Sequence, residues 1–496
     1  MKKVIKNLAA SFCGQIITVI LGLIIPRLVL TSFGSDINGL INSTTQLFAY
    51  IALLEAGVGT ATLQALYSPI TKSAHQDINK ILAATDHFYK RTGSMYFLCV
   101  VILAVGYPFV VKTEITNSTI ILVILLQGMS GVLNYFFQGK YRILLQAEGK
   151  NYILTNLATV VQILVGIGKV IVIYLGFDIV AVQFVYFLIN VFQMSYILFY
   201  MKKHYCWINL KVSPNYDAIS QKYDVFVGQI SSLVFNNTDS ILLTLFCDLK
   251  AVSVYSVYLM LCNMINTVVD NISASITFKF GELYSLDVNK FKRIQKIFER
   301  YYLCLIFWLY NVAFIFIVPF LSLYTRGVSD ANYLDDKLAL LFVIMQLISY
   351  SKRPFNQVVN MAQKFKETKW RSVAEAVINL GVSLIAVQKY GIYGVLIGSI
   401  VALIYRLIDL ILYTNKIMDE SSISSLKNLI IDTIVFVLIW YISSNFISSF
   451  SNYMTLFVSA GIVTVISGIL FIGTNSICSL ADTKYIIATI KSFRRI

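Results

Sequence analysis

Charged residues are scarce in this chain, and their scarcity is the first constraint on its class. Of its 496 residues 13% are charged and 57% are hydrophobic, whereas soluble domains average about 25% charged residues. The mean hydropathy is +0.74. This composition leaves no stretch for a soluble domain and indicates a protein that lies in a membrane along most of its length.

The usual marks of metal and nucleotide chemistry are missing as well. The seven cysteines form no CxxC pair and mostly fall within apolar runs, so we interpret them as packing residues. The three histidines, His75, His87 and His204, have no clustered partners, and we predict no metal site. No GxxxxGK[ST] loop for ATP occurs. We therefore predict no bound cofactor. The short outer loops, considered below, are the reason that we do not expect an enzyme.

What the chain does contain is long apolar runs separated by short polar turns. A bilayer core about 30 Å thick needs about 20 apolar residues in a helix. We predict an all-α polytopic protein with about fourteen crossings, placed at Leu8–Leu30, Gly39–Tyr67, Gly93–Val111, Ser118–Gln138, Tyr152–Leu175, Ile179–Tyr200, Val225–Phe246, Ala251–Phe278, Tyr301–Tyr324, Leu338–Met361, Ser372–Val387, Gly391–Tyr413, Asn428–Phe446 and Tyr453–Ile472.

The positive charges provide an independent check on this division. If Met1 lies inside, the cytoplasmic segments hold 30 of the 40 Lys and Arg residues, and the outer loops and the helices hold 5 each. Lysine and arginine favour cytoplasmic loops, and one missing helix would invert every later loop. We therefore expect an even number of crossings and both termini in the cytoplasm. The first run has no small-residue cleavage site, so we interpret it as a retained helix.

The formal net charge of +15 does not indicate nucleic-acid binding. The basic residues are spread over many inner segments, where anionic lipid headgroups are the expected partners.

A weak internal repeat predicts two lobes. Gly14-Gln15-Ile16 opens the first crossing and Gly228-Gln229-Ile230 opens the seventh. A six-helix repeat would place a substrate site between the lobes. We predict an N-terminal lobe over 1–200, a cytoplasmic connector over 201–224, a C-terminal lobe over 225–413, and two extra helices with a cytoplasmic tail over 414–496.

Several short motifs carry a resemblance to a known family, and the resemblance covers nearly the whole chain. They are Pro26-Arg27, Phe33-Gly34 with Gly39-Leu40, Leu54-Glu55-Ala56-Gly57-Val58-Gly59, Leu144-Leu145-Gln146-Ala147-Glu148-Gly149-Lys150, and Asp239. In their order and spacing the chain resembles the Wzx-type polysaccharide flippases of the multidrug/oligosaccharidyl-lipid/polysaccharide exporter (MOP) superfamily. It departs from the family's acidic Asp-Gly-like pattern in the second helix, where an alanine separates Glu55 from Gly57.

The resemblance implies a flippase in a bacterial cytoplasmic membrane. Its cargo would be an oligosaccharide repeat unit on a polyprenyl diphosphate, moved from the inner to the outer leaflet by alternating access for O-antigen or capsule synthesis. Glycosyltransferases and a polysaccharide polymerase would be its partners.

Cations deep in the apolar runs are the first candidates for the site, because ionisable groups are costly in a bilayer and usually face a cavity. We predict that Arg27, Lys169, Lys352 and Arg353 receive the diphosphate of such a cargo, for which arginine forks are well suited. The alternative is that these cations form packing ion pairs with the deep carboxylates.

Two prolines lie directly beside these cations. Pro26 precedes Arg27 and Pro354 follows Arg353. Proline removes an internal hydrogen bond and bends a helix, so we predict hinges at both positions, although packing alone also accounts for such prolines.

Three deep carboxylates, Glu55, Asp239 and Asp270, are the candidates for coupling to a proton or sodium gradient, which is the expected energy source when no ATP loop is present. A static salt bridge is the alternative for each. Nearer the ends of their helices, Arg406, Asp409 and Asp432 are expected to form structural pairs or to reach the headgroups.

Two rival functions remain open. A multidrug or organic-cation antiporter of the same superfamily would need an acidic, aromatic cavity, which four deep cations disfavour. A polysaccharide polymerase would handle the same lipids but generally carries a large outer loop, and the longest outer loop here spans only 325–337.

Overall fold

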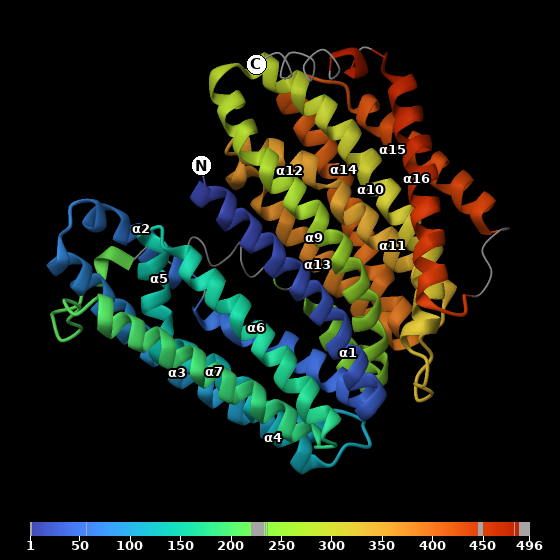
Figure 1. Cartoon of the computed structure of the whole chain (residues 1–496). Coiled ribbons are helices and arrows are strands. Elements are labelled where there is room, and N and C mark those ends of the chain that lie inside the picture. The colour runs from blue at the N-terminus through green and yellow to red at the C-terminus, as the bar shows by residue number, and fades with distance from the viewer. Residues whose placement is uncertain are drawn as a thin grey trace. The chain divides into compact units, whose positions relative to one another are not determined.

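The computed structural model describes residues 2–55, 57–219, 233, 235, 237–444, 450–480 and 482–485, and this part of the chain is helical without strands (Figure 1). Its elements are α1 (Lys2–Ile51), η1 (Ala52–Glu55), α2 (Val58–Thr71), α3 (His75–Val110), α4 (Asn117–Leu133), η2 (Asn134–Gln138), α5 (Gly139–Ala147), α6 (Asn151–Tyr174), α7 (Ile179–His204), η3 (Asp217–Ile219), α9 (Leu249–Leu286), α10 (Val288–Tyr324), α11 (Asp336–Ser351), α12 (Arg353–Met361), α13 (Phe365–Tyr390), α14 (Ile392–Met418), α15 (Ser422–Ser444) and α16 (Tyr453–Cys478).

The predicted all-helical membrane fold is confirmed. Within the described residues, eleven helices are long and apolar enough to span a bilayer. Three of the fourteen predicted crossings, the second, the seventh and the tenth, are not separate helices among these eleven. The second shares α1 with the first and breaks after Ile51, the tenth is divided into α11 and α12, and most of the seventh lies outside the described residues.

The helices form two compact units. Unit 1 comprises residues 1–256 and 328–331, and unit 2 comprises 257–327 and 332–496. These units are defined by contacts between residues within the chain. The predicted lobes, 1–200 and 225–413, are defined by a sequence repeat, and their boundaries stay predictions.

In unit 1 the sharpest backbone feature is Gly34, where φ is 83° and α1 changes direction. A Cβ at this position would lie 3.0 Å from Asp330 Oδ2. The Ser35 backbone N–H and the Ser35 hydroxyl each donate to the Asp330 carboxylate at 2.7 Å. Asp330 therefore caps the second half of α1, and glycine satisfies both the left-handed conformation and the close approach.

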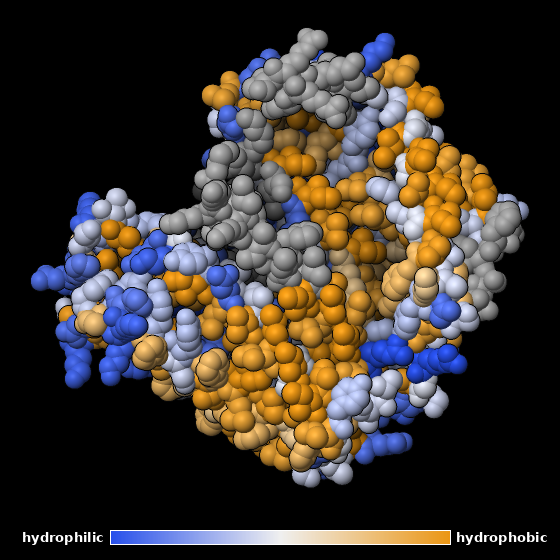
Figure 2. Space-filling model, viewed as in Figure 1, coloured by the Kyte–Doolittle hydropathy of each residue, from blue (hydrophilic) through white to orange (hydrophobic). Residues whose placement is uncertain are grey.

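The other helices of unit 1 bury one face and present apolar side chains on the opposite face. Val100 and Ile124 are fully buried between α3 and α4, whereas Ile102 and Phe192 are 62% and 53% exposed. Figure 2 shows this hydrophobic surface along the helices, with hydrophilic residues at the end that carries α2 and α5. Exposed apolar surface of this extent is expected where lipid is the solvent.

Unit 2 is held together by the close approach of α13 and α14. A Cβ on Gly398 would lie 2.1 Å from Ser383 Oγ, and one on Gly394 would lie 2.3 Å from the Ala386 carbonyl oxygen. Small residues that let two backbones meet are the usual means of association for membrane helices.

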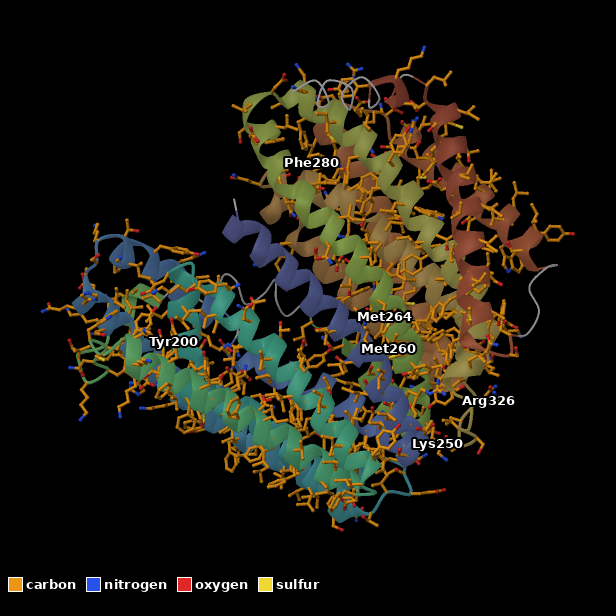
Figure 3. All side chains as sticks on the ribbon, viewed as in Figure 1. Tyr200, Lys250, Met260, Met264, Phe280 and Arg326 are labelled. Atoms are coloured by element: carbon orange, nitrogen blue, oxygen red, sulfur yellow. The ribbon has the colours of Figure 1, made fainter. Side chains whose placement is uncertain are left out.

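The long helix α9 contributes a row of apolar side chains to unit 2. Met260 and Met264 lie one turn apart on it, and Phe280 lies toward its C-terminal end (Figure 3). The Phe280 ring packs edge-on against Phe291 and Phe298 of α10, with centroids 5.8 and 5.1 Å apart. These contacts fix the C-terminal end of α9 against the start of α10.

The described part of the predicted connector packs on unit 1. The Asn79 side chain donates to the Trp207 carbonyl at 3.2 Å and accepts from the Asn209 N–H at 3.2 Å. The rings of His75 and Trp207 lie 4.1 Å apart. Residues 205–219 are thereby attached to the start of α3, and the predicted connector beyond 219 lies outside the described residues.

Candidate functional site

The first candidate site lies in unit 1, where the second predicted crossing is broken at Glu55. The helix ends in the turn η1, and Gly57 (φ 88°) precedes α2. On the facing segment the helix widens into the π-helical turn η2 between α4 and α5. π-helical turns of this kind occur frequently at functional sites.

The side chain of Glu55 is surrounded by hydrogen-bond donors. The Tyr89 hydroxyl donates to Glu55 Oε1, and the Tyr135 hydroxyl and Arg142 guanidinium face the same carboxylate. Arg142 also donates to Asn134 Oδ1 at 3.4 Å. A carboxylate deep in the membrane thus accepts a hydrogen bond from one phenol and has a second phenol and a cation on the same side, an arrangement that can hold or exchange a small cation or a proton.

Arg142 is a candidate site residue that sequence reasoning missed. The predicted fourth crossing ends at Gln138, so Arg142 was assigned to a cytoplasmic loop, but the helix continues through η2 and α5 to Ala147. The same extension buries Lys140, which is 7% exposed and paired with Asp86. The signal available in the sequence was the apolar run Ile143–Leu145 beyond the two cations.

Lys169 lies on α6 and contacts an aromatic ring. Its Nζ stands 5.2 Å from the centroid of Tyr186, which is a cation–π distance. Among the described residues, no carboxylate forms an ion pair with it. The side chain is half-buried, so the positive charge has an aromatic neighbour and no anionic partner from this part of the chain.

The register of two helices places Lys169 at about the same level along the helix axes as Arg27. Thr18 on α1 donates to Gln162 on α6 at 2.8 Å, an offset of 144 residues, and Leu21 packs on Gly166 with a similar offset. The same offset puts Lys169 level with residues 24–25. Arg27 is then about 3 to 5 Å further along the axis, so the two predicted cations stand at one level of unit 1.

Pro26 itself does not interrupt α1. The helix continues through it, and the reversal of direction lies eight residues later, at Gly34. The hinge at Pro26 stays a prediction.

Asp239 is 5% exposed and accepts a hydrogen bond from the Tyr255 hydroxyl at 2.8 Å. The neighbouring Thr238 pairs with the Tyr50 hydroxyl at 2.5 Å. Two phenols from α1 and α9 therefore surround this segment of unit 1, and Asp239 resembles Glu55 in being a membrane carboxylate that binds tyrosine.

In unit 2 the structure brings Arg353 and Asp270 together. Arg353 Nη1 lies 2.5 Å from Asp270 Oδ1, and the two side chains are 40% and 45% exposed. The Arg353 guanidinium also covers the Tyr350 ring at 4.3 Å. This pair joins α9 to α12 and remains accessible on one side.

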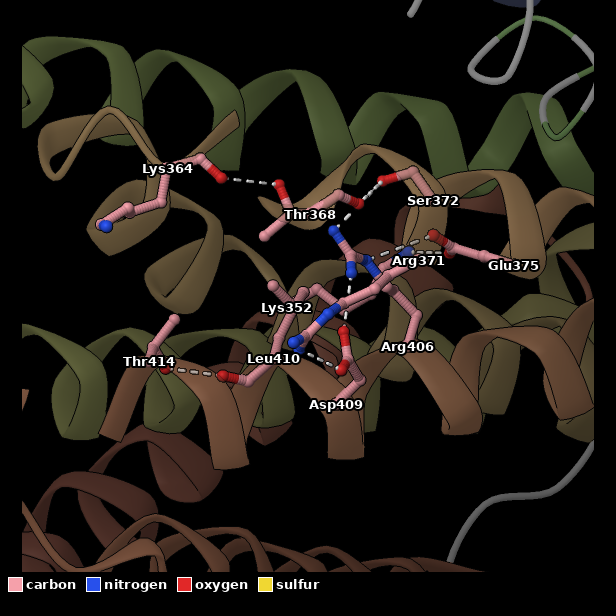
Figure 4. Close-up of polar contacts among 10 residues, drawn as sticks. All are labelled: Lys352, Lys364, Thr368, Arg371, Ser372, Glu375, Arg406, Asp409, Leu410 and Thr414. Carbon is pink, nitrogen blue, oxygen red and sulfur yellow. Dashed lines mark hydrogen bonds and ion pairs between the residues drawn. The ribbon is translucent and has the colours of Figure 1, made fainter. Parts of the chain in front are cut away.

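Lys352 belongs to a different, buried network (Figure 4). Its Nζ lies 2.5 Å from Glu375 Oε1, with both side chains nearly buried. Glu375 Oε2 is 3.6 Å from Arg406 Nε, and Arg406 and Arg371 both bind Asp409, at 2.7 and 2.6 Å. Adjacent in sequence, Lys352 and Arg353 thus point to separate partners.

The break between α11 and α12 lies at these two cations. Pro354 occupies the first turn of α12, where its missing N–H breaks no helical bond. Its carbonyl oxygen accepts a hydrogen bond from the Gln295 amide at 2.8 Å. The interruption is therefore fixed by α10, and hinge motion at this point stays a prediction.

The motif Leu144–Lys150 forms the turn from α5 to α6. Lys150 Nζ lies 2.8 Å from Glu148 Oε2 and donates to the Tyr205 hydroxyl at 2.9 Å, while Tyr205 donates to Glu148 at 2.5 Å. Hydrogen bonds to Glu148 and Tyr205 raise the pKa of Lys150. Burial, together with the Glu148 carboxylate, raises the pKa of Tyr205 to about 12. The motif thus fastens this turn to the end of α7.

Comparison with solved structures places this fold. The chain superposes on the lipid II flippase MurJ in an inward closed conformation with a TM-score of 0.72 and 14% identity, covering 95% of this chain and 98% of that one. An inward-facing multidrug resistance MATE family transporter of the MOP superfamily matches with a TM-score of 0.64, 16% identity, and coverage of 81% and 94%. An outward-facing multidrug resistance MATE family transporter matches with a TM-score of 0.54 and 13% identity, covering 83% of this chain and 94% of that one.

At the level of sequence, no protein-family model matches the chain and no curated protein does. The chain is a multi-pass membrane protein with the fold of the MOP transporters. Within that fold it is similar over nearly its full length to a lipid II flippase, and over a smaller share to the multidrug transporters.

Proposed function

We propose that the protein is a flippase that moves a polyprenyl-diphosphate-linked oligosaccharide from the inner to the outer leaflet of a bacterial cytoplasmic membrane. The proposal rests on two cations, Arg27 and Lys169, that lie at about the same level along the helices of unit 1. Lys169 contacts an aromatic ring and forms no ion pair with a carboxylate of the described residues. A cation kept inside a membrane without an anionic partner suits an anionic ligand.

The diphosphate is the part of the cargo that these cations would bind. Arg27 offers a guanidinium fork and Lys169 a point charge, and the two together match the charge of a pyrophosphate. In unit 2, Arg353 keeps part of its side chain exposed beside Asp270 and would serve as a second contact. Lys352 is nearly buried with Glu375 and supports the helices instead.

An ion gradient would supply the energy. Glu55, Asp239 and Asp270 are the carboxylates available for a proton or sodium ion. Glu55 and Asp239 are each hydrogen-bonded by tyrosine within unit 1. Protonation of either would change its hydrogen bonds with neighbouring helices, which is how ion binding can bias an alternating-access cycle.

The polymer and the partners follow from the resemblance to Wzx-type flippases. O-antigen or capsule repeat units are the proposed cargo, and glycosyltransferases and a polysaccharide polymerase the proposed partners. The full-length similarity to a lipid II flippase supports a lipid-linked cargo without deciding which sugar it carries.

The alternative is an organic-cation antiporter, and the similarity to MATE transporters favours it. Such a protein would expose carboxylates and aromatic rings to a cation. The partly buried Arg27 and Lys169 would repel that substrate, so we place this function second.

The leaflet position of the lipid-linked oligosaccharide tests the proposal. In a strain that lacks the gene, this lipid should accumulate in the inner leaflet, and the wild-type gene should restore its outward movement. Lys169→Met should restore little movement, whereas Lys169→Arg should restore most of it because the positive charge remains. Accumulation in the outer leaflet would indicate a polymerase, and full function of Lys169→Met would contradict the proposed role of this cation.

A further inference from the structure

Three helices of unit 2, α10, α15 and α16, enclose a polar cluster that the proposed transport cycle does not use. They lie side by side in Figure 1. The outward face of α15 is apolar, with Ile430, Ile434 and Leu438 more than half exposed. Its inward face, where apolar packing would be expected, carries polar residues.

The polar residues on α15 form one stripe. Ser425, Asn428 and Asp432 follow one another at helical spacing and are 2%, 3% and 0% exposed. Residues separated by three and four positions share one face of a helix. The stripe begins one turn from the start of α15 and ends at Asp432, so it runs from the end of the unit into its interior.

Two neighbouring helices contribute charge and amide groups to the same cluster. From α16, the Asn475 amide donates to Asp432 Oδ1 at 2.7 Å. From α10, Glu299 faces Ser425 and Asn428, while Arg300 and the Cys304 thiol face Asp432. Among the described residues of the helices packed against α15, these are the titratable and charged groups of the cluster.

Several buried polar atoms of the cluster lack a hydrogen bond. Within the described chain, no hydrogen-bond partner is found for Asp432 Oδ2, Arg300 Nε or Arg300 Nη1. Arg300 Nη1 does lie 3.4 Å from Asp482 Oδ2, an acid that is 24% exposed. Buried polar atoms are normally satisfied by protein or by ordered water. This concentration of unsatisfied atoms in one place fits a hydrated passage.

We propose that Ser425, Asn428, Glu299 and Arg300 line a hydrated half-channel that brings protons from the end of unit 2 where α15 begins, the predicted inner side, to Asp432. A hydronium ion would transfer its proton to Asp432 Oδ2 and leave as water, forming a neutral carboxylic acid. An ionised carboxylate with one unsatisfied oxygen is costly at full burial in a membrane protein, and proton uptake removes that penalty.

The assignment differs from the proposed coupling carboxylates in place and in chemistry. Glu55 and Asp239 are bound by tyrosines in unit 1, and Asp270 is paired with Arg353. Asp432 is bound by an amide and lies at the inner end of the polar stripe on α15. The inference therefore does not depend on the proposed cargo, and it survives or fails independently of the flippase function.

Infrared spectroscopy of the full-length protein in lipid nanodiscs tests the proposal. The spectrum is recorded between about pH 5 and about pH 9, where shifted carboxyl groups titrate, and the carbonyl band of a protonated carboxyl is followed. We expect one such titrating band to be absent in Asp432→Asn, which keeps an oxygen for the Asn475 amide. Asp482→Asn, which removes an acid outside the proposed half-channel, should retain it. The pH dependence of the melting temperature should decrease in Asp432→Asn alone.

Three results would overturn the assignment. The first is a protonated-carboxyl spectrum of Asp432→Asn that is unchanged across the pH range. The second is loss of the band in Glu299→Gln with retention in Asp432→Asn, which would place the proton on the other acid. The third is stabilisation of the wild type, but not of Asp432→Asn, by sodium chloride relative to choline chloride at constant pH without any effect of pH, which would identify a sodium site.

Discussion

Arg353 and Asp270 form a close ion pair between α12 and α9, with Nη1 and Oδ1 2.5 Å apart, and yet each side chain remains about two-fifths exposed. Ion pairs that face water contribute only about 0 to 1 kcal/mol to stability, and a pair that lines the water-filled path proposed for the cargo belongs to this class. The pair therefore does little to hold the helices together, and its exposed cation is available to a ligand.

Replacing this exposed arginine should affect transport more than stability. We expect Arg353→Gln to lower the free energy of unfolding by no more than about 1 kcal/mol and to reduce outward movement of the lipid-linked oligosaccharide severalfold. Thermal unfolding and the leaflet assay measure the two effects on the same preparation. A large loss of stability with normal transport would assign Arg353 to structure.

The buried pair of Lys352 and Glu375 should behave in the opposite way. Glu375→Gln leaves Lys352 without its 2.5 Å partner and weakens the contact with Arg406, and breaking a buried pair costs about 3 to 5 kcal/mol. We expect a large fall in melting temperature, measured in detergent or nanodiscs.

The double variant Lys352→Met/Glu375→Gln provides the control for that experiment. It removes both charges together and should recover much of the lost stability. If the double variant is as unstable as Glu375→Gln, an unpaired lysine is not the reason for the loss.

Sequence patterns predict the helices well here because apolar length and loop charge are both set by the bilayer. They do not predict interruptions. The crossing predicted to end at Gln138 continues to Ala147 through a π-helical turn, and hydropathy falls there because Lys140 and Arg142 are present. Lys140 is buried against Asp86 and Arg142 is half-buried on the side of Glu55, and no local pattern reveals these neighbours from distant segments.

The same reasoning explains the candidate sites. Sequence reasoning identified Arg353 and Asp270, which the structure pairs. It identified Lys352 without its partner, because Glu375 lies in another predicted crossing, Ser372–Val387, and the sequence does not show which helices face each other. A charged residue within a long apolar run is expected to lie inside the membrane. Which residue its side chain contacts, if any, depends on how the helices pack, and the local sequence does not show this.

Gly34 should be less replaceable than Gly176, another glycine of unit 1 with a positive φ. An alanine there would adopt φ 83° and place its Cβ 3.0 Å from Asp330 Oδ2. Gly176 has a similar φ of 78° with no atom within 4 Å, so Gly176→Ala measures the conformational penalty alone, about 1 to 2 kcal/mol. We expect Gly34→Ala to lower the melting temperature further. If the two substitutions lower the melting temperature equally, the close approach to Asp330 does not contribute to the effect at Gly34.

The cap between Asp330 and Ser35 should depend on pH. Burial alone would raise the pKa of Asp330, but hydrogen bonds from Ser35 outweigh it and hold the pKa below its ordinary value of 3.8. A carboxyl whose pKa is depressed in the folded state contributes stability above its unfolded pKa and loses it as the pH falls through the folded pKa. The contribution should thus be complete at neutral pH and decline below 3.8. Melting temperatures at neutral and acidic pH should converge for wild type and Asp330→Asn as the pH falls.

The coupling carboxylates can be tested by separating ion binding from cargo binding. Glu55→Gln and Asp239→Asn keep a side chain that accepts a hydrogen bond from Tyr89 and Tyr255 respectively, but neither can be ionised. We expect each variant to fold and to lose the dependence of oligosaccharide movement on an imposed proton or sodium gradient in proteoliposomes. Tyr255→Phe serves as the control, because it removes one hydrogen bond and leaves Asp239 ionisable, so gradient dependence should remain. If both amide variants still respond to the gradient as the wild type does, neither carboxylate is a coupling site, and Asp270 would be the remaining candidate among the three.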